Sequence, residues 1–344
     1  MFRNTFSKKV FIIIFFLLII LTPLLLNAEL ERGVKIESHT VIPDLTFIFQ
    51  AETSSSINLY LAGSNGQIQQ LTHTAFAQNA SLSPDGNNVF FEDMAYSEIG
   101  EPYHIFKLDL NSKKITPIST DKSKLDCAPR CSPDGKYLAF SSRVADPNMD
   151  APWRIYIMDI NGKNRYPLDT EGDTNQSTPS WSPDSAKIVF VHSQLLPIKA
   201  LPGLPLAFPI ATPKIRDLKT KTTSSMLPAG LAVNDTTWSP LGDRIAFNAH
   251  DPINNTKTIW IVGVDGLHLE RVTDGPDDEQ PAWCPDETKL AFTRIKEGKK
   301  GVICLVDLKT RKVTELFSSS DASLEQPQVL CSKNLSAQNK GILN

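Results

Sequence analysis

The stretch Ser83-Pro84-Asp85-Gly86 returns along the chain at nearly regular intervals. The copies start 49, 50, 57 and 45 residues apart. A repeat of this length with β-rich content is typical of a β-propeller, a ring of four-stranded blades. The close copies are Ser132-Pro133-Asp134-Gly135 and Ser182-Pro183-Asp184-Ser185, and the weaker copies are Ser239-Pro240-Leu241-Gly242 and Cys284-Pro285-Asp286-Glu287.

Each copy predicts a tight turn between two strands. Proline suits the second position of a type I turn, and aspartate and glycine are favoured after it. A short run rich in β-branched and aromatic residues follows each copy, which favours a buried strand over a helix. Each unit is therefore interpreted as one four-stranded blade. The runs are Val89-Phe90-Phe91, Tyr137-Leu138-Ala139-Phe140, Ile188-Val189-Phe190, Ile245-Ala246-Phe247 and Leu290-Ala291-Phe292.

Three tryptophans stand directly before a turn: Trp181, Trp238 and Trp283. They occupy one position of the repeat, so we expect all three to have the same structural role. A large side chain beside the turn is expected to pack between neighbouring blades.

The two ends of the chain predict how the ring closes. Residues 42–49 and 59–72 contain a degenerate copy of the turn and three strands. They form a first blade that lacks one of its four strands. Glu325-Gln326-Pro327 repeats Glu279-Gln280-Pro281 and begins a strand that no blade follows. We therefore expect the C-terminal strand to complete the N-terminal blade. The prediction is an all-β, six-bladed propeller of four-stranded antiparallel blades over residues 29–331.

The repeat also resembles that of a known family. Trp181-Ser182-Pro183-Asp184 at a turn and Ile155-Tyr156-Ile157-Met158-Asp159 in a later strand resemble the TolB-type (PD40, WD40-like) propeller repeat, over roughly residues 40–331. The resemblance implies the ring fold. For function it implies only a range, because scaffolds, peptidase gates and sugar-degrading enzymes share such repeats. TolB carries an α/β domain before its propeller, whereas only about a dozen residues separate Ala28 from Ile42 here. We expect a TolB-like propeller without that domain.

The first 28 residues predict export. Arg3, Lys8 and Lys9 precede an apolar stretch over 10–26, and Leu26-Asn27-Ala28 is an acceptable cleavage site. The alternative is an uncleaved anchor, which would be the only contact with a membrane. Either way the propeller is expected in the periplasm or elsewhere outside the cytoplasm, with residues 332–344 as a polar tail.

The net charge and the sequence motifs limit the range of functions to consider. The net charge is −3 and no basic run occurs, which argues against a nucleic-acid partner. The five cysteines and six histidines are scattered and are interpreted as structural residues. No catalytic residues are expected, because the sequence lacks the common metal, nucleophile and phosphate-loop motifs.

Strand order places the polar residues that enter each first strand around the mouth of the channel, on the face opposite the repeated turns. Carboxylates and amides that converge there are the oxygen ligands that Ca²⁺ prefers. The alternative is a polar, water-filled funnel. The mouth residues are Gln78, Asn79, Asp126, Asn175, Gln176, Asn234, Asp235, Glu279, Gln280, Glu325 and Gln326, and the candidate metal ligands among them are Asp126, Asn175, Asp235, Glu279 and Glu325.

One connection on that face differs from the others. The segment Gln194 to Pro213 is predicted to be a long loop that accounts for the 57-residue spacing, and it is apolar and rich in proline. It is expected either to fold back as a lid over its own blade or to present a stiff apolar contact to a partner. The candidate partner-binding residues are Leu201, Leu204, Leu206, Phe208, Ile210, Asn234, Gln280 and Gln326.

Three functions fit these features. The first is a monomeric envelope scaffold that binds a protein or peptide partner through the loop face, and the absence of catalytic motifs favours it. The second is a carbohydrate-active lyase or hydrolase with a cation-assisted site at the channel mouth. The third is a propeller that gates a peptidase.

Overall fold

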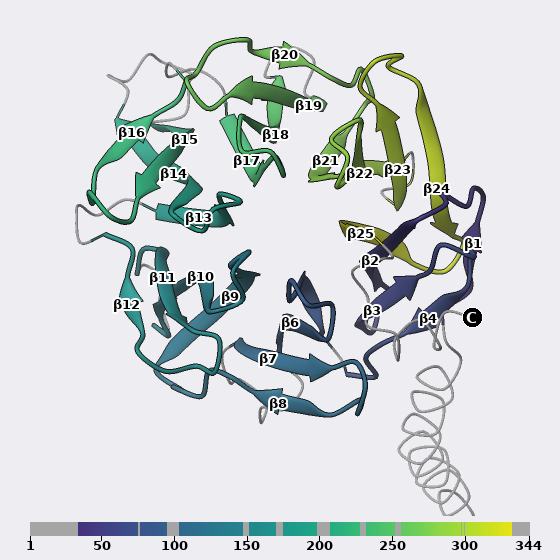
Figure 1. The fold of residues 1–344 in the computed structure, drawn as a ribbon, viewed down its shortest axis with the longest axis horizontal. Helices are drawn as coiled ribbons and strands as arrows, with labels where there is room; N and C mark the ends of the chain where they lie inside the picture. Colours follow the sequence, from purple (N-terminus) through teal and green to yellow (C-terminus); the bar gives the residue numbers. More distant parts are fainter. Residues whose placement is uncertain are drawn as a thin grey trace, which may run out of the picture. The chain divides into compact units, whose positions relative to one another are not determined.

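The strands of the chain form six antiparallel sheets, arranged as blades around a ring (Figure 1). The computed structural model describes residues 34–74, 76–94, 103–146, 151–169, 175–197, 207–227, 232–251, 256–296, 298 and 300–331. The predicted signal peptide and the predicted polar tail lie outside these residues. No helix in the described ranges is long and apolar enough to cross a membrane. The six-bladed, all-β prediction is confirmed.

Within each blade the strands follow one another outward from the ring centre. The first three blades are β25 (Ser323–Cys331), β2 (Leu45–Glu52), β3 (Ile57–Ala62) and β4 (Ile68–Gln70); β5 (Gln78–Leu82), β6 (Asn88–Asp93), β7 (His104–Asp109) and β8 (Ile115–Pro117); and β9 (Lys124–Cys131), β10 (Tyr137–Val144), β11 (Arg154–Asp159) and β12 (Tyr166–Pro167). The other three are β13 (Asn175–Trp181), β14 (Lys187–Pro197), β15 (Ala207–Asp217) and β16 (Thr223–Ser225); β17 (Ala232–Trp238), β18 (Arg244–Asp251), β19 (Thr256–Gly263) and β20 (Glu270–Arg271); and β21 (Asp278–Trp283), β22 (Lys289–Ile295), β23 (Gly301–Asp307) and β24 (Val313–Ser319).

The ring closes between blade 6 and blade 1, as predicted. The C-terminal strand β25 is the inner strand of blade 1 and pairs with β2 from Leu45↔Cys331 to Glu52↔Ser323. A second link was not predicted: β1 (Ile36–Ser38) pairs with β24 on the outer edge of blade 6. The same junction holds Phe317, whose ring lies 5.2 Å from that of Phe49. The N-terminal and C-terminal strands therefore both join the first and last blades.

A recurring set of hydrogen bonds explains which residues occur in the repeated turns. In the copy at 132–135 the Ser132 hydroxyl donates to Asp134 Oδ1 at 2.6 Å, and Gly135 N donates to Ser132 O at 2.9 Å. Asp134 Oδ1 also accepts from Lys136 N at 3.1 Å. The fourth residue is left-handed in every copy, which favours glycine. Its φ is 71° at Gly86, 72° at Gly135, 58° at Ser185, 86° at Gly242 and 54° at Glu287.

The two weaker copies compensate for each other across the boundary of blades 5 and 6. Leu241 stands where the motif has aspartate, and Asp243 Oδ1 instead accepts from the Ser239 hydroxyl at 3.1 Å. Glu287 stands where the motif has glycine, and its carboxylate accepts from Leu241 N and from Arg244 Nη2, the latter at 2.6 Å. Asp243 thus takes over the role of the motif aspartate toward Ser239, and a side chain of the next blade adds a second acceptor at this turn.

The core consists of apolar clusters between neighbouring blades, and the three tryptophans lie in them. Trp181 packs with Ile155 and Ile157 of the preceding blade, and Trp238 and Trp283 occupy the corresponding clusters. Their exposed fractions are only 6–8%. The predicted structural role is confirmed.

The indole nitrogens differ in their partners, which allows a matched test. Trp181 Nε1 donates to Arg130 O at 2.9 Å, whereas Trp238 Nε1 is buried and has no partner among the described residues. We expect Trp181→Phe to lower the free energy of unfolding by about 1 kcal/mol more than Trp238→Phe does, because only the first change removes a hydrogen bond. Either change to alanine should cost about 3–5 kcal/mol. Chemical denaturation of the four variants checks this, and an equal or larger cost for Trp238→Phe would contradict it.

Closure by β25 predicts the effect of truncation. A chain ending at Ala322 loses β25 and exposes β2, and we expect it to lose on the order of 5 kcal/mol of stability or more, because a buried leucine such as Leu324 alone contributes about 2–5 kcal/mol. A chain ending at Cys331 keeps every pairing of β25 and is the control. Thermal unfolding of the two chains distinguishes them. If both unfold at the same temperature, the closure has no energetic importance.

Candidate functional site

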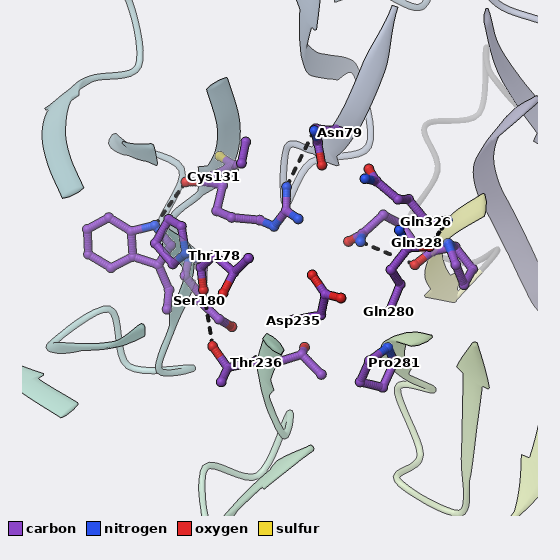
Figure 2. Close-up of a pocket in the computed structure, with 17 residues that line it drawn as sticks. Asn79, Cys131, Thr178, Ser180, Asp235, Thr236, Gln280, Pro281, Gln326 and Gln328 are labelled. Carbon is purple, nitrogen blue, oxygen red and sulfur yellow. Dashed lines mark hydrogen bonds between the residues drawn. The ribbon is translucent and has the colours of Figure 1, made fainter. Parts of the chain in front are cut away.

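A cavity of about 200 Å³ lies in the channel and is lined by the inner strands of all six blades (Figure 2). The lining is mostly polar, with one fixed positive charge at Arg130 and one carboxylate at Asp235. Cys131 and Trp181 also contact the cavity, and all five cysteines are free thiols. Because the inner strands of all six blades contribute to the cavity, we take it as the candidate site.

A ring of β-bulges shapes the cavity. Each inner strand loses register with its neighbour at one point, and a left-handed residue stands at that point. A bulge turns the local backbone out of the ladder and redirects side chains. All six left-handed residues line the cavity. They are Asn79, Ala128, Thr178, Asp235, Gln280 and Gln326, with φ of 56°, 50°, 49°, 48°, 55° and 54°.

Four of these six residues were predicted at the channel mouth: Asn79, Asp235, Gln280 and Gln326. Ala128, Thr178 and the neighbouring Arg130 were not predicted there. A signal was present, because proline directly follows the bulge residue in four blades, and proline within a strand marks an edge or a bulge. These prolines are Pro129, Pro179, Pro281 and Pro327.

At three of the six bulges, a side chain of the preceding blade accepts a hydrogen bond from the backbone N–H of the left-handed residue. Asn79 N donates to Gln50 Oε1 at 3.2 Å, and Ala128 N donates to Glu92 Oε2. Gln326 N donates to Gln280 Oε1 at 2.9 Å. Buried polar side chains therefore join successive blades around the channel, where an unpaired N–H would be costly.

Of these three bulge acceptors, Glu92 accepts the most hydrogen bonds. It is only 3% exposed, and besides Ala128 N it accepts from Gln78 Nε2 and Asn79 Nδ2, both at 2.9 Å. Burial raises the pKa of Glu92 to about 7, although these donors and Arg130 oppose the rise. The carboxyl therefore titrates near neutral pH.

Arg130 and Asp235 place opposite charges in the channel. Arg130 Nη1 donates to Pro129 O at 2.9 Å and to Asn79 O at 3.4 Å. Burial, and then the charge of Glu279, raises the pKa of Asp235 to about 6, while Arg130 and Lys257 oppose the rise. Although each charge acts on the other, no ion pair within 4 Å joins Arg130 or Asp235 to any described residue. The two charges thus face a shared space.

The other predicted metal ligands lie in separate local contacts. Asp126 is fully buried and its Oδ2 pairs with Arg165 Nη1 at 2.8 Å, and Glu279 Oε1 pairs with Lys257 Nζ at 2.5 Å. Asn175 Oδ1 accepts from Trp153 N at 2.9 Å. Glu325 accepts from the Ser323 hydroxyl at 2.8 Å, and burial raises its pKa. The described residues hold no group of three or more His, Cys, Asp or Glu arranged for a metal ion. Calcium binding stays a prediction.

The predicted long loop from Gln194 to Pro213 was wrong for most of its length. Strands β14 and β15 continue in register to Pro197↔Ala207, so Phe208 and Ile210 belong to β15. Leu201, Leu204 and Leu206 lie outside the described residues, and Asn234 is exposed in β17.

Two of the prolines that suggested a loop, Pro209 and Pro213, occur at edge positions of strand β15. Pro213 O accepts from Met226 N at 3.3 Å, so the backbone of Pro213 points away from β14. Strand geometry repeats every two residues, so Pro209 points the same way. A missing N–H on that outer side costs the β14–β15 ladder nothing.

The pKa of Glu92 predicts how stability depends on pH. Between about pH 4.5, the ordinary value, and about pH 7, the folded chain holds a proton that the unfolded chain has released. The contribution is therefore present at low pH and is lost as the pH rises toward 7, by up to about 3 kcal/mol. Asp235 adds a change of the same sign between about pH 3.8 and 6. Denaturation at pH 5 and pH 8 should show a smaller difference for Glu92→Gln than for the parent, and equal differences would contradict the assignment.

Comparison with known proteins finds solved structures that share this fold. No family model and no curated protein matches the chain. Among solved structures, TolB from Acinetobacter baumannii has a TM-score of 0.65 and 18% identity over 83% of this chain and 66% of its own. A putative TolB from Agrobacterium tumefaciens has a TM-score of 0.59 and 16% identity, over 83% of this chain and 99% of its own. An oligogalacturonate lyase in complex with manganese has a TM-score of 0.51 and 16% identity, over 82% of this chain and 73% of its own.

These likenesses agree with the resemblance seen in the repeats. The chain spans just under two thirds of the Acinetobacter TolB and nearly all of the Agrobacterium chain. At such identities the likeness concerns the architecture. The chain has the six-bladed propeller fold of TolB.

Proposed function

We propose that this protein is an exported propeller scaffold that binds a protein or peptide partner through the face that carries the β14–β15 hairpin. The observation that carries the proposal is the length of that hairpin. Strand β14 has 11 residues, whereas the second strands of the other blades have six to eight. The likeness to TolB propellers supports a scaffold, and the N-terminal 28 residues support export.

The extended part of β14 and β15 begins beyond the last residue pair between β13 and β14. Among the described residues β13 pairs with β14 only as far as Asn175↔Ser193. Four further pairs follow between β14 and β15, from Gln194↔Ile210 to Pro197↔Ala207. We call residues 194–210 the arm, of which the structure describes 194–197 and 207–210. It stands on the side of the ring opposite the repeated turns, because it joins the second strand to the third.

The arm suits contact through side chains rather than strand addition. Pro209 and Pro213 remove N–H donors from the outer edge of β15, which blunts that edge against pairing with another chain. The sequence of the arm is rich in leucine, with Phe208 and Ile210 on its returning strand. A segment with this apolar sequence suits a groove on a partner protein.

Deletion of the arm tests the proposal. Replacing residues 195–209 with Asn-Gly joins Gln194 to Ile210 through a two-residue turn, which such a pair accepts. The shorter loop costs little in closure entropy, so the ring should stay folded by circular dichroism. We expect at least about a tenfold loss in recovery of envelope proteins by the tagged deletion variant, since arm contacts worth about 1.4 kcal/mol already give that factor.

The matched control lies on the opposite face. Leu241 is 79% exposed at a repeated turn, so Leu241→Asp changes an exposed apolar side chain without touching the arm. Partners recovered by the parent and by this control, and lost from the deletion variant, support the proposal. Equal recovery by all three chains removes the arm from binding. A deletion variant that no longer folds would show instead that the arm packs as a lid on its own blade.

A further inference from the structure

We infer that the central cavity binds a small α-amino carboxylate, either a free amino acid or the C-terminal residue of a peptide. The inference rests on which polar groups the cavity leaves without partners, and it is independent of the arm. The cavity has room for roughly six water molecules at about 30 Å³ each, and therefore for a ligand of about that many non-hydrogen atoms.

The donor side of the cavity is Arg130. Both of its hydrogen bonds to described residues use Nη1, and their acceptors are the backbone oxygens of Pro129 and Asn79. The remaining edge of the guanidinium has no acceptor there. A guanidinium edge with two parallel N–H groups matches a carboxylate. This side of the cavity therefore favours a ligand carboxylate.

The acceptor side lies across the channel. Figure 2 shows the Asp235 carboxylate pointing into the space between Thr178 on one side and Gln280 and Gln326 on the other. Gln326 Oε1 and Thr178 Oγ1 are buried and have no hydrogen-bond partner among the described residues. With its amide oriented to satisfy its neighbours, the Asn248 side chain donates to Asp235 Oδ2 at 3.0 Å. Asp235 Oδ1 and Gln326 Oε1 are therefore the acceptors left for N–H donors, and the Thr178 hydroxyl serves either role.

The mixture of charges selects the chemical class. A phosphate or other dianion is opposed by Asp235, and a divalent cation is opposed by Arg130. A free amino acid pairs its carboxylate with Arg130 and its ammonium group with Asp235, and the C-terminal residue of a peptide pairs its carboxylate with Arg130 and offers a neutral N–H donor to Asp235. Buried polar groups reject ligands that leave them unpaired, so the cavity is selective for this combination.

Calorimetric titration of the full chain tests the inference with four probes: L-alanine, L-serine, L-alaninamide and N-acetyl-L-alanine. We expect L-alanine or L-serine to bind and L-alaninamide, which lacks the carboxylate, to fail. N-acetyl-L-alanine distinguishes the two sources. Binding of this probe identifies the C-terminal residue of a peptide, and its failure identifies a free amino acid. If none of the probes binds at millimolar concentration, the cavity holds water alone and the inference is overturned.

Substitutions of Arg130 and Asp235 test whether these two side chains bind the ligand. Arg130→Gln and Asp235→Asn should each weaken L-alanine binding at least about tenfold, because each substitution removes a charged group that forms a hydrogen bond with the ligand. Arg143→Gln is the control, since that guanidinium lies over the Trp153 ring, 4.6 Å from its centroid, and does not line the cavity. Unchanged affinity in both cavity variants would overturn the inference.

A further variant covers the case in which Arg130→Gln does not fold. Gln326→Met keeps the shape of the side chain and removes the unpaired Oε1. It should weaken L-alanine binding while leaving the melting temperature equal or higher, because a buried acceptor without a partner is lost. A higher melting temperature with unchanged binding would show that Oε1 faces no ligand, and would overturn this part of the site.

Discussion

The pairing of β25 with β2 is the interaction on which the rest of the structure depends. It joins the two ends of the described chain through one ladder, from Leu45↔Cys331 to Glu52↔Ser323. The same strand supplies the sixth bulge residue, Gln326, so the cavity is complete only when the ring is closed. Because β1 also pairs with β24, the junction is held on its outer edge as well as its inner one. The stability of the fold and the completeness of the candidate site therefore both depend on this closure.

Around the channel, the bulges exchange one kind of stabilisation for another. A bulge removes ladder hydrogen bonds and leaves an N–H that needs an acceptor. Gln50, Glu92 and Gln280 provide such acceptors from the blade before, so the loss within a blade becomes a bond between blades. At the two weaker turns a bond between blades runs in the opposite direction, because Glu287 accepts from Leu241 N of the preceding blade. Contacts between neighbours thus let single copies of the repeat diverge while the ring persists.

The fold was predictable because its signal is repeated. Five turns with a shared hydrogen-bond pattern, together with the Glu-Gln-Pro echo at Glu325, were enough to predict six blades and their closure. The short strand β1 has no repeated partner in the sequence and was missed. The arm was mistaken for a loop because Pro209 and Pro213 favour loops in general, and only the pairing partner of a strand shows that a proline stands at an outer edge. Arg130 was missed because it follows a bulge, which shifts the alternation of side chains by one residue.

The charges of the channel require an explanation that the fold does not supply. Five of the six bulge residues are neutral, and Gln50 and Gln280 serve as acceptors without charge, so the architecture works with amides. Asp235 and Arg130 instead face a shared space, and burial raises the pKa of Asp235 to about 6, which shows that its charge is costly there. A structural channel has no need of such a cost. A carboxylate with an N–H group on the adjacent carbon would satisfy opposite charges that face one cavity without pairing directly, beside buried acceptors without partners.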